Sequence, residues 1–208
     1  MIMTEDTNSI LRTIKQHFRL LMNGVVSSSM RDKGVDYHLN WGVSLPHLSE
    51  MAKEYGKNYP LALALWKENI RECKILATMI MPHEKMSRDI AEQWGGEIPS
   101  IELAEISSFY LFGYLSFASE IANEWIASDL PMKQICGFHI YSRLFAQGFI
   151  MQDQHFEPFL ANTLVALKHQ SLAIKHAAFS CLQRFAQQSV SNSNIVEKTC
   201  KNNHLELF

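Results

Sequence analysis

Three of the four tryptophans recur at nearly equal spacing through the middle of the chain, at Trp66, Trp94 and Trp125. The spacings are 28 and 31 residues, and each tryptophan ends one apolar helical stretch before another begins. These spacings fall slightly below the roughly 33–47 residues of the common helical repeats. One helical repeat cannot bury its apolar side alone, so neighbouring repeats must stack. The pattern therefore predicts helix pairs stacked into a short, curved solenoid.

Composition agrees with one well-packed core. Of the 208 residues, 47% are hydrophobic and 19% are charged, which excludes a disordered chain. Apolar runs stay well below the ~20 residues that a membrane helix needs, so we expect no membrane partner. No linker rich in Pro, Gly or Ser divides the chain, which predicts a single domain over residues 1–208. The first nine residues lack the pattern of a secretion signal, so a cytoplasmic location is expected.

Helical periodicity covers almost the whole chain, and alternating strand patterns and Asn-Gly turns are absent, so we expect almost no strand. The first helix should start from Asp6 or Thr7 as N-cap and stop at Gly24, and another should lie between a Ser44 cap and Gly56. The remaining helices are expected over residues 25–33, 60–66, 70–77, 101–115, 135–145 and 172–187. The polar tail, residues 189–208, should be either weakly ordered or a short terminal helix.

The cysteines argue against a disulfide framework or a zinc site. They are scattered, without a Cys-x-x-Cys pair, at Cys73, Cys136, Cys181 and Cys200. The first three fall on helical patterns, which predicts reduced and mostly buried thiols. Metal-binding, nucleotide-binding and hydrolase motifs are also missing, so we expect neither a metal nor a cofactor. His139 lies on an apolar helix one turn before Arg143, where a core or interface histidine is favoured over a catalytic one.

The charge distribution offers only a local basic region. The net charge is −2, with 12 basic and 10 acidic residues in positions 1–90 and 7 against 11 in positions 91–208. A nucleic-acid binder normally shows a basic stripe, because neutralising phosphates releases counterions. Arg71 and Lys74 share a helix face and would suit a phosphate, but Glu68 and Glu72 lie close enough to neutralise them. A solvated helix face of mixed charge is therefore the favoured alternative.

One segment resembles the signature of a known family. Residues 42–53 read Gly-Val-Ser-Leu-Pro-His-Leu-Ser-Glu-Met-Ala-Lys. This is similar to the HEAT-like DNA alkylation repair family, the AlkD-type DNA glycosylases, with their Gly-Val-x-x-Pro-x-Leu motif. Two further stretches support the resemblance, Leu65-Trp66 leading into residues 71–77, and residues 179–185. The resemblance covers about residues 25–188 and implies an all-α superhelix of HEAT-like helix pairs.

The resemblance implies an enzyme that lies along double-stranded DNA with a concave face and excises purines alkylated at N3 or N7. Such a cationic base is already a good leaving group, so the protein stabilises the positive sugar with a carboxylate and with indole faces. The family places an aspartate four residues after a tryptophan. Trp94 matches that tryptophan, but Ile98 stands in the aspartate position. Glu97 and Glu102 are therefore the candidate carboxylates, with Glu105 beside Glu102 as a further one.

The resemblance also implies DNA-contacting residues, for which the candidates are Trp66, Arg71, Lys74 and Arg143. The family's phosphate-contacting arginine would fall near Cys136 or Gly137, and Arg143 carries the nearest guanidinium. Ser180 and Ser49 occupy two further positions where the family has a tryptophan and a basic residue. Two hypotheses remain open. The chain is either a DNA-binding repair protein, with or without catalysis, or an inactive helical-repeat scaffold that binds a protein or peptide. Trp94 fits either a catalytic role or simple core packing.

Overall fold

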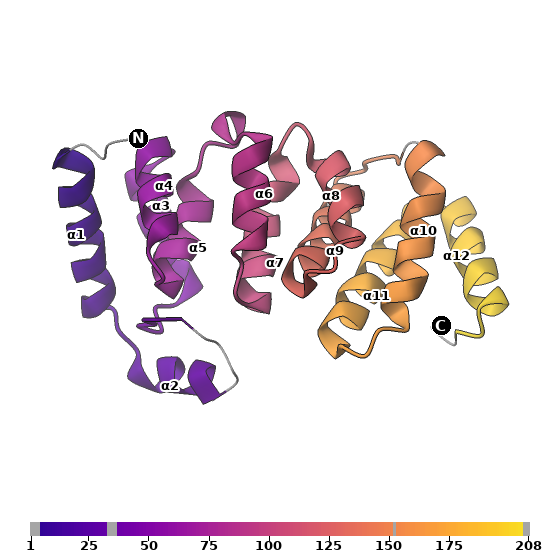
Figure 1. Cartoon of the computed structure of the whole chain (residues 1–208), viewed down its shortest axis with the longest axis horizontal. Helices are drawn as coiled ribbons and strands as arrows, with labels where there is room; N and C mark the ends of the chain where they lie inside the picture. Colours follow the sequence, from indigo (N-terminus) through magenta and orange to yellow (C-terminus); the bar gives the residue numbers. More distant parts are fainter. Residues whose placement is uncertain (1–4, 33–36, 152, 206–208) are drawn as a thin grey trace. The chain divides into compact units, whose positions relative to one another are not determined.

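The computed structural model describes residues 5–32, 37–151 and 153–205, and nearly all of them belong to helices (Figure 1). The α-helices are α1 (Glu5–Leu20), α2 (Gly24–Asp32), α3 (Leu45–Tyr55), α4 (Tyr59–Lys67), α5 (Arg71–Ile80), α6 (Arg88–Gly96), α7 (Ile101–Tyr110), α8 (Ala118–Ile126), α9 (Pro131–Ala146), α10 (Asp153–Leu167), α11 (Leu172–Ala186) and α12 (Val190–Asn202). Short 3-10 turns, η1 (His83–Lys85) and η2 (Phe112–Tyr114), lie between them. Within the described ranges the only β-type pairing is an isolated bridge between Leu39 and Ile70. The all-α prediction is confirmed.

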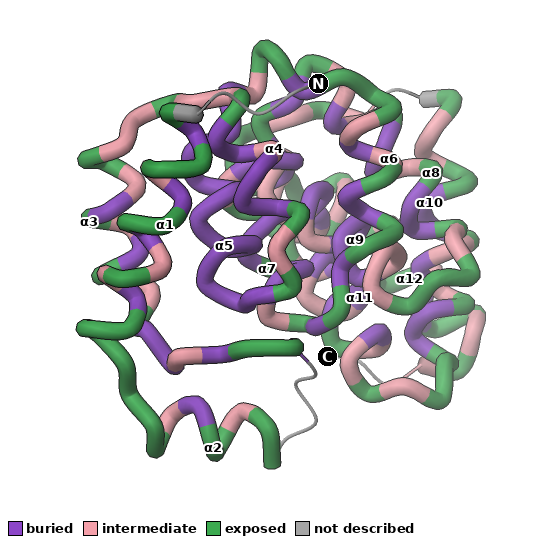
Figure 2. The backbone as a smooth tube through the Cα atoms, turned by 60° about the vertical axis from the view of Figure 1, so that its left-hand side comes forward, coloured by how far each residue is buried: buried purple, intermediate pink, exposed green. Residues whose placement is uncertain are grey.

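The helices form two compact units, Met1–Glu92 and Gln93–Phe208, and the boundary between them falls within α6. In the first unit α5 packs on α3 and α4, and α1 packs on α4. Every residue of α5 is buried, so this helix is the centre of the unit (Figure 2). The expectation of one domain over the whole chain stays a prediction.

The second unit stacks its helices in two rows. α9 packs on α7, α8 and α11, while α10 packs on α8 and α11, and α12 covers α11. Trp125 from α8 meets the edge of the Phe112 ring at 5.0 Å between ring centroids. Phe145, Phe159 and Phe185 form a second aromatic cluster between α9, α10 and α11, with ring centroids 5.3–5.6 Å apart. These rings bury the large apolar area on which a fold without strands depends.

Local signals fix several helix ends as expected. Ser44 precedes α3 and Gly56 follows it with a positive φ of 61°, a conformation that glycine adopts without strain. Asn58 caps α4 by accepting a hydrogen bond from the backbone N–H of Leu61 at 3.1 Å. The four cysteines are buried and free of disulfides, as expected. No helix in the described part of the chain is long and apolar enough to cross a membrane.

Other boundaries differ from expectation. Gly24 does not end α1, which stops at Leu20. It begins α2, because the Asn23 side chain accepts a hydrogen bond from the backbone of Val26 and caps the new helix. The helix expected over residues 101–115 ends at Tyr110, and η2 follows it. The sequence also failed to predict α10, which contains Pro158. For the tail, the alternative of a terminal helix is confirmed, as α12.

Candidate nucleic-acid interface

The family-like signature surrounds a buried carboxylate in the first unit. Glu72 on α5 is fully buried and accepts hydrogen bonds from three consecutive backbone N–H groups, those of Trp41, Gly42 and Val43, at 3.0–3.2 Å. Arg71 donates to the carbonyl of Val43 at 3.0 Å and to Glu72 Oε1 at 3.1 Å. The pair therefore fixes the chain that leads into α3. We call Arg71, Glu72 and residues 41–43 the signature clasp.

Gly42 is required at this place for two reasons. Its φ is +71°, and a Cβ atom would lie 2.4 Å from the backbone oxygen of Asn23 and 2.8 Å from the backbone nitrogen of Ser27. Any other residue would force the backbone of α2 away from the clasp. The glycine of the signature thus serves the packing of the chain rather than contact with a ligand.

Three of the expected DNA-contacting residues lie in the interior of the first unit. Trp66 and Arg71 are each 2% exposed and Lys74 is 7% exposed. Lys74 Nζ donates to the backbone oxygen of Trp66 at 3.0 Å and lies 4.3 Å from the centroid of its ring. This burial favours structural roles for all three, and it overturns the alternative of a solvated, mixed-charge face for Arg71 and Lys74. Because these side chains are buried, their positions give no support to the expected contact with a DNA phosphate.

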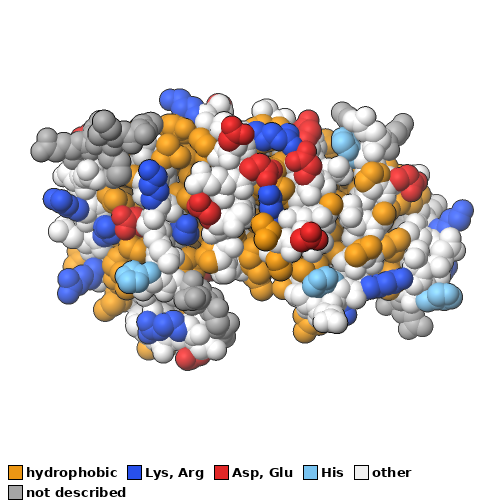
Figure 3. Space-filling view, viewed as in Figure 1, with side chains coloured by type: hydrophobic (Ala, Val, Ile, Leu, Met, Phe, Trp, Pro, Cys, Tyr) orange, Lys and Arg blue, Asp and Glu red, His pale blue; other side chains and the backbone are white. Residues whose placement is uncertain are grey.

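The exposed basic charge of the first unit lies elsewhere. α1 carries exposed Arg12 and Arg19, and Lys15 pairs with Glu68 at 3.2 Å. Figure 3 shows Lys and Arg side chains over α1 and α2 on the visible face. Acidic and basic side chains both lie over α6, and both also lie over α8. The i, i+3 pair of Arg71 and Lys74 on α5 is buried, so that sequence pattern did not indicate where the exposed charge lies.

Of the expected catalytic residues, Trp94 is buried and Glu97 is exposed. Trp94 on α6 is 2% exposed, and Ile98, in the position of the family's aspartate, is 5% exposed. Beside Trp94, Gly95 leaves room for Trp125, whose Cη2 would lie 2.6 Å from an added Cβ. Glu97 is exposed and accepts a hydrogen bond from Gln93 at 2.8 Å. These positions favour core packing for Trp94.

The fourth expected DNA-contacting residue is held in a defined place on the second unit. Arg143 on α9 lies between the rings of Phe109 and Tyr114, with its guanidinium carbon 4.1 and 4.5 Å from their centroids. The guanidinium also donates a hydrogen bond to the hydroxyl of Tyr114. Gly113 makes room for the stem of the arginine, since an added Cβ would lie 2.8 Å from Arg143 Cδ. We call Phe109, Tyr114 and Arg143 the aromatic clamp.

The two rings of the clamp are accessible, with Phe109 53% and Tyr114 45% exposed. Neither residue was among the expected site residues. The signal that would have found them is the aromatic run of residues 109–114, followed one repeat later by an arginine. An arginine near exposed rings is a common arrangement for cation–π contacts.

A pocket of about 730 Å³ lies between α7 and α11 beside the clamp. Its polar members are Glu105, His139, Lys175 and His176, and its apolar members include Ile101, Leu172 and Phe179. His139 Nε2 lies 3.7 Å from Glu105 Oε1. Burial, together with the charge of His176, lowers the pKa of His139 to about 4. Burial raises the pKa of Glu105, against an opposing effect of His176.

Glu102 and His139 are the remaining candidate residues in this part of the second unit. Glu102 is half-buried on α7, one turn before Glu105, as the sequence indicated. His139 is half-buried on α9. At neutral pH its imidazole is uncharged, so this part of the surface gains no positive charge from it. Lys133, Arg143, Lys175 and Arg184 are the cationic side chains of the row formed by α7, α9 and α11.

Comparison with known proteins places this arrangement in a family. The model of the family described as "DNA alkylation repair enzyme" matches residues 14–192. A solved structure described as "A new family of proteins related to the HEAT-like repeat DNA glycosylases with affinity for branched DNA structures" is similar, with a TM-score of 0.76. The likeness covers 91% of this chain and 81% of that chain at 20% sequence identity, so it shows a shared fold. No curated protein matches the sequence. The chain belongs to the DNA alkylation repair enzyme family.

Proposed function

We propose that the protein binds DNA through the row of α7, α9 and α11, with Arg143 contacting a phosphate. The observation that carries the proposal is the aromatic clamp, which holds the guanidinium between two rings and a hydroxyl. A cation that is already positioned loses little side-chain freedom when it binds a phosphate. Family membership and the affinity of the structural neighbour for branched DNA both support a DNA ligand.

We further propose that branched DNA is preferred over continuous duplex. Exposed aromatic rings stack on unpaired bases, an interaction worth about 1–3 kcal/mol per base. Phe109 and Tyr114 offer such rings on both sides of Arg143. A continuous duplex keeps its bases stacked inside, so it would use only the charge of the clamp. Double-stranded DNA therefore remains a ligand, with lower affinity.

Fluorescence anisotropy with a labelled four-way junction and a duplex of equal length tests this proposal at low salt. Arg143→Gln should weaken binding of both DNAs by about tenfold and reduce the slope of log affinity against log salt by about one. Lys198→Gln is the matched control, because it removes one exposed charge from α12 of the same unit. Equal loss in both variants would refute a specific role for the clamp.

Excision of alkylated purines is expected to be absent or very slow. The buried Trp94 and the apolar Ile98 disfavour the family's use of an indole and a carboxylate at the sugar. Release of 7-methylguanine and 3-methyladenine from alkylated duplex is the direct measurement. Release that is lost in both Glu97→Gln and Glu102→Gln would instead establish an enzyme that uses these carboxylates. Release that survives both changes would exclude them from the reaction.

A second candidate function is binding of a protein or peptide. It is favoured by apolar side chains exposed at the 730 Å³ pocket, Ile101 at 42% and Leu172 at 79%. Exposed apolar groups beside a pocket often mark interaction sites. This candidate takes precedence if neither the junction nor the duplex is retained at low salt. Leu172→Glu should then abolish partner binding while leaving the helical content unchanged.

A further inference from the structure

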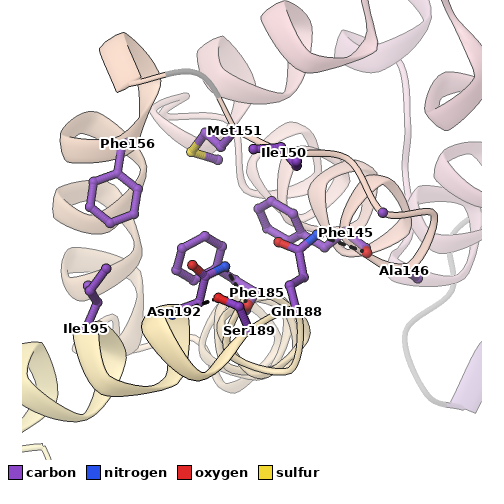
Figure 4. A pocket seen from close by; sticks show the side chains of 11 residues that line it. Phe145, Ala146, Ile150, Met151, Phe156, Phe185, Gln188, Ser189, Asn192 and Ile195 are labelled. Carbon is purple, nitrogen blue, oxygen red and sulfur yellow. Dashed lines mark hydrogen bonds between the residues drawn. The ribbon is translucent and has the colours of Figure 1, made fainter.

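A second cavity of the second unit, of about 670 Å³, opens between the end of α9 and helices α10, α11 and α12 (Figure 4). Its size lies within the roughly 300–1,000 Å³ of small-molecule sites. Phe145, Phe156 and Phe185 supply aromatic walls, and Met151 adds a thioether. The Phe185 ring lies 5.3 Å from that of Phe145 and 5.8 Å from that of Phe156, between centroids. Such walls favour a flat aromatic ligand.

Two side-chain amides give this cavity a polar edge of known orientation. Gln188 Nε2 donates to the backbone oxygens of Phe145 at 3.2 Å and Phe149 at 2.8 Å. Asn192 Nδ2 donates to the backbone oxygen of Phe185 at 3.1 Å. Because each nitrogen must face a carbonyl, neither amide can flip. The oxygens of Gln188 and Asn192 are therefore directed to the cavity side, as Figure 4 shows.

The chemistry of the lining selects against charged ligands. The described lining residues include no Lys, Arg, His, Asp or Glu. Burying an unpaired charge in such surroundings is costly, whereas two amide oxygens call for hydrogen-bond donors. We infer that this cavity binds an uncharged, planar, fused-ring heteroaromatic molecule that carries N–H donors along one edge.

This site is separate from the proposed DNA interface. Arg143 and Phe145 are two residues apart on α9, so their side chains point to nearly opposite sides of the helix, about 200° apart. The clamp faces α7, whereas Phe145 faces α10 and α11. The cavity can therefore be tested without reference to DNA.

Lumichrome is a suitable probe, because it is uncharged, has three fused rings and carries two N–H donors, and its fluorescence reports stacking. Titration into the full chain should give saturable quenching. The matched ligand is 1,3-dimethyllumichrome, which has the same rings without the donors. It should bind about thirtyfold more weakly, as expected for the loss of two hydrogen bonds. Equal affinity for the two ligands, or no binding of lumichrome, would overturn the inference.

A pair of variants locates the binding. Ile195→Trp places a bulky side chain into the cavity and should abolish quenching. Val190→Trp adds the same side chain at a position on α12 that is 79% exposed and should leave quenching intact. Far-UV circular dichroism identifies any variant that fails to fold, and the comparison of the two ligands on the unaltered protein needs no variant. Lumichrome binding that survives Ile195→Trp in a folded protein would place the ligand elsewhere and reject this site.

Discussion

At the scale of single residues, the buried Glu72 accepts hydrogen bonds from three backbone N–H groups, and its removal has a definite expected effect. Glu72→Gln would turn an amide N–H₂ toward backbone N–H donors and remove the carboxylate that lies 3.1 Å from the buried guanidinium of Arg71. Breaking a buried ion pair costs about 3–5 kcal/mol. The free energy of unfolding of Glu72→Gln, measured with urea, should be lower than that of the unaltered chain by about this amount. Glu68→Gln is the control, since the half-exposed pair with Lys15 is worth at most about 1 kcal/mol.

Gly95 and Gly96 are adjacent glycines at the end of α6 with opposite expected responses to alanine. A Cβ on Gly95 would lie 2.6 and 2.7 Å from ring atoms of Trp125, so Gly95→Ala should destabilise the protein by about 1–3 kcal/mol. A Cβ on Gly96 meets nothing within 4 Å, and alanine favours a helix by about 1 kcal/mol over glycine. Thermal unfolding of the two variants should therefore shift in opposite directions. A loss in both would show that the ring contact is not the cause.

At the scale of elements, the packing of α7, α9 and α11 links stability to pH through His139. Burial lowers its folded-state pKa from 6.5 to about 4, so the unfolded chain takes up the proton first as pH falls. The stabilisation is complete above pH 6.5 and is lost between pH 6.5 and about 4, by about 3 kcal/mol. Urea unfolding of His139→Gln over this range should show a smaller loss than the unaltered chain.

Glu105 provides the control for that experiment because its effect has the opposite sign. Its raised pKa means that the folded state holds the proton more tightly than the unfolded chain, which favours folding at low pH. Glu105→Gln removes this contribution. The acid-induced loss of stability should therefore be no smaller in Glu105→Gln than in the unaltered chain, and a smaller loss would assign the effect to the carboxyl group.

A helix end could be predicted from the sequence where its signal lies in the residues at that end. Features that depend on contacts with other helices could not. Ser44 and Gly56 bound α3 as expected, because Pro46 in the first turn and the positive φ of Gly56 are signals that act within one turn. Gly113, just after the end of α7 at Tyr110, lies against Arg143 from another helix, and nothing in residues 101–115 indicates that contact. For the site, Arg143 is half-buried on α9, and its contact with DNA stays a prediction. The burial of Arg71 and Lys74 was not, since an i, i+3 cationic pair has the same pattern whether or not other helices cover it.

At the scale of the whole molecule, repeat proteins gain stability from neighbouring contacts, so local damage should stay local. Native-state hydrogen exchange of Glu72→Gln should speed up mainly at the amides of residues 39–80, around the signature clasp. Gly95→Ala should speed up exchange mainly around α6 and α8, beside Trp125. Uniform acceleration across the chain in either variant would instead indicate one cooperative unit.

The signature clasp explains how a chain can keep the family's sequence signature without keeping the family's reaction. Gly42 and its neighbours are constrained by an internal carboxylate, so selection for a stable chain alone is enough to retain them. Recognition by that motif therefore selects molecules that fold alike, whatever reaction they perform. Trp94 and Glu97 lie outside the clasp, so exchanges at such positions would leave the contacts that hold the signature segment intact.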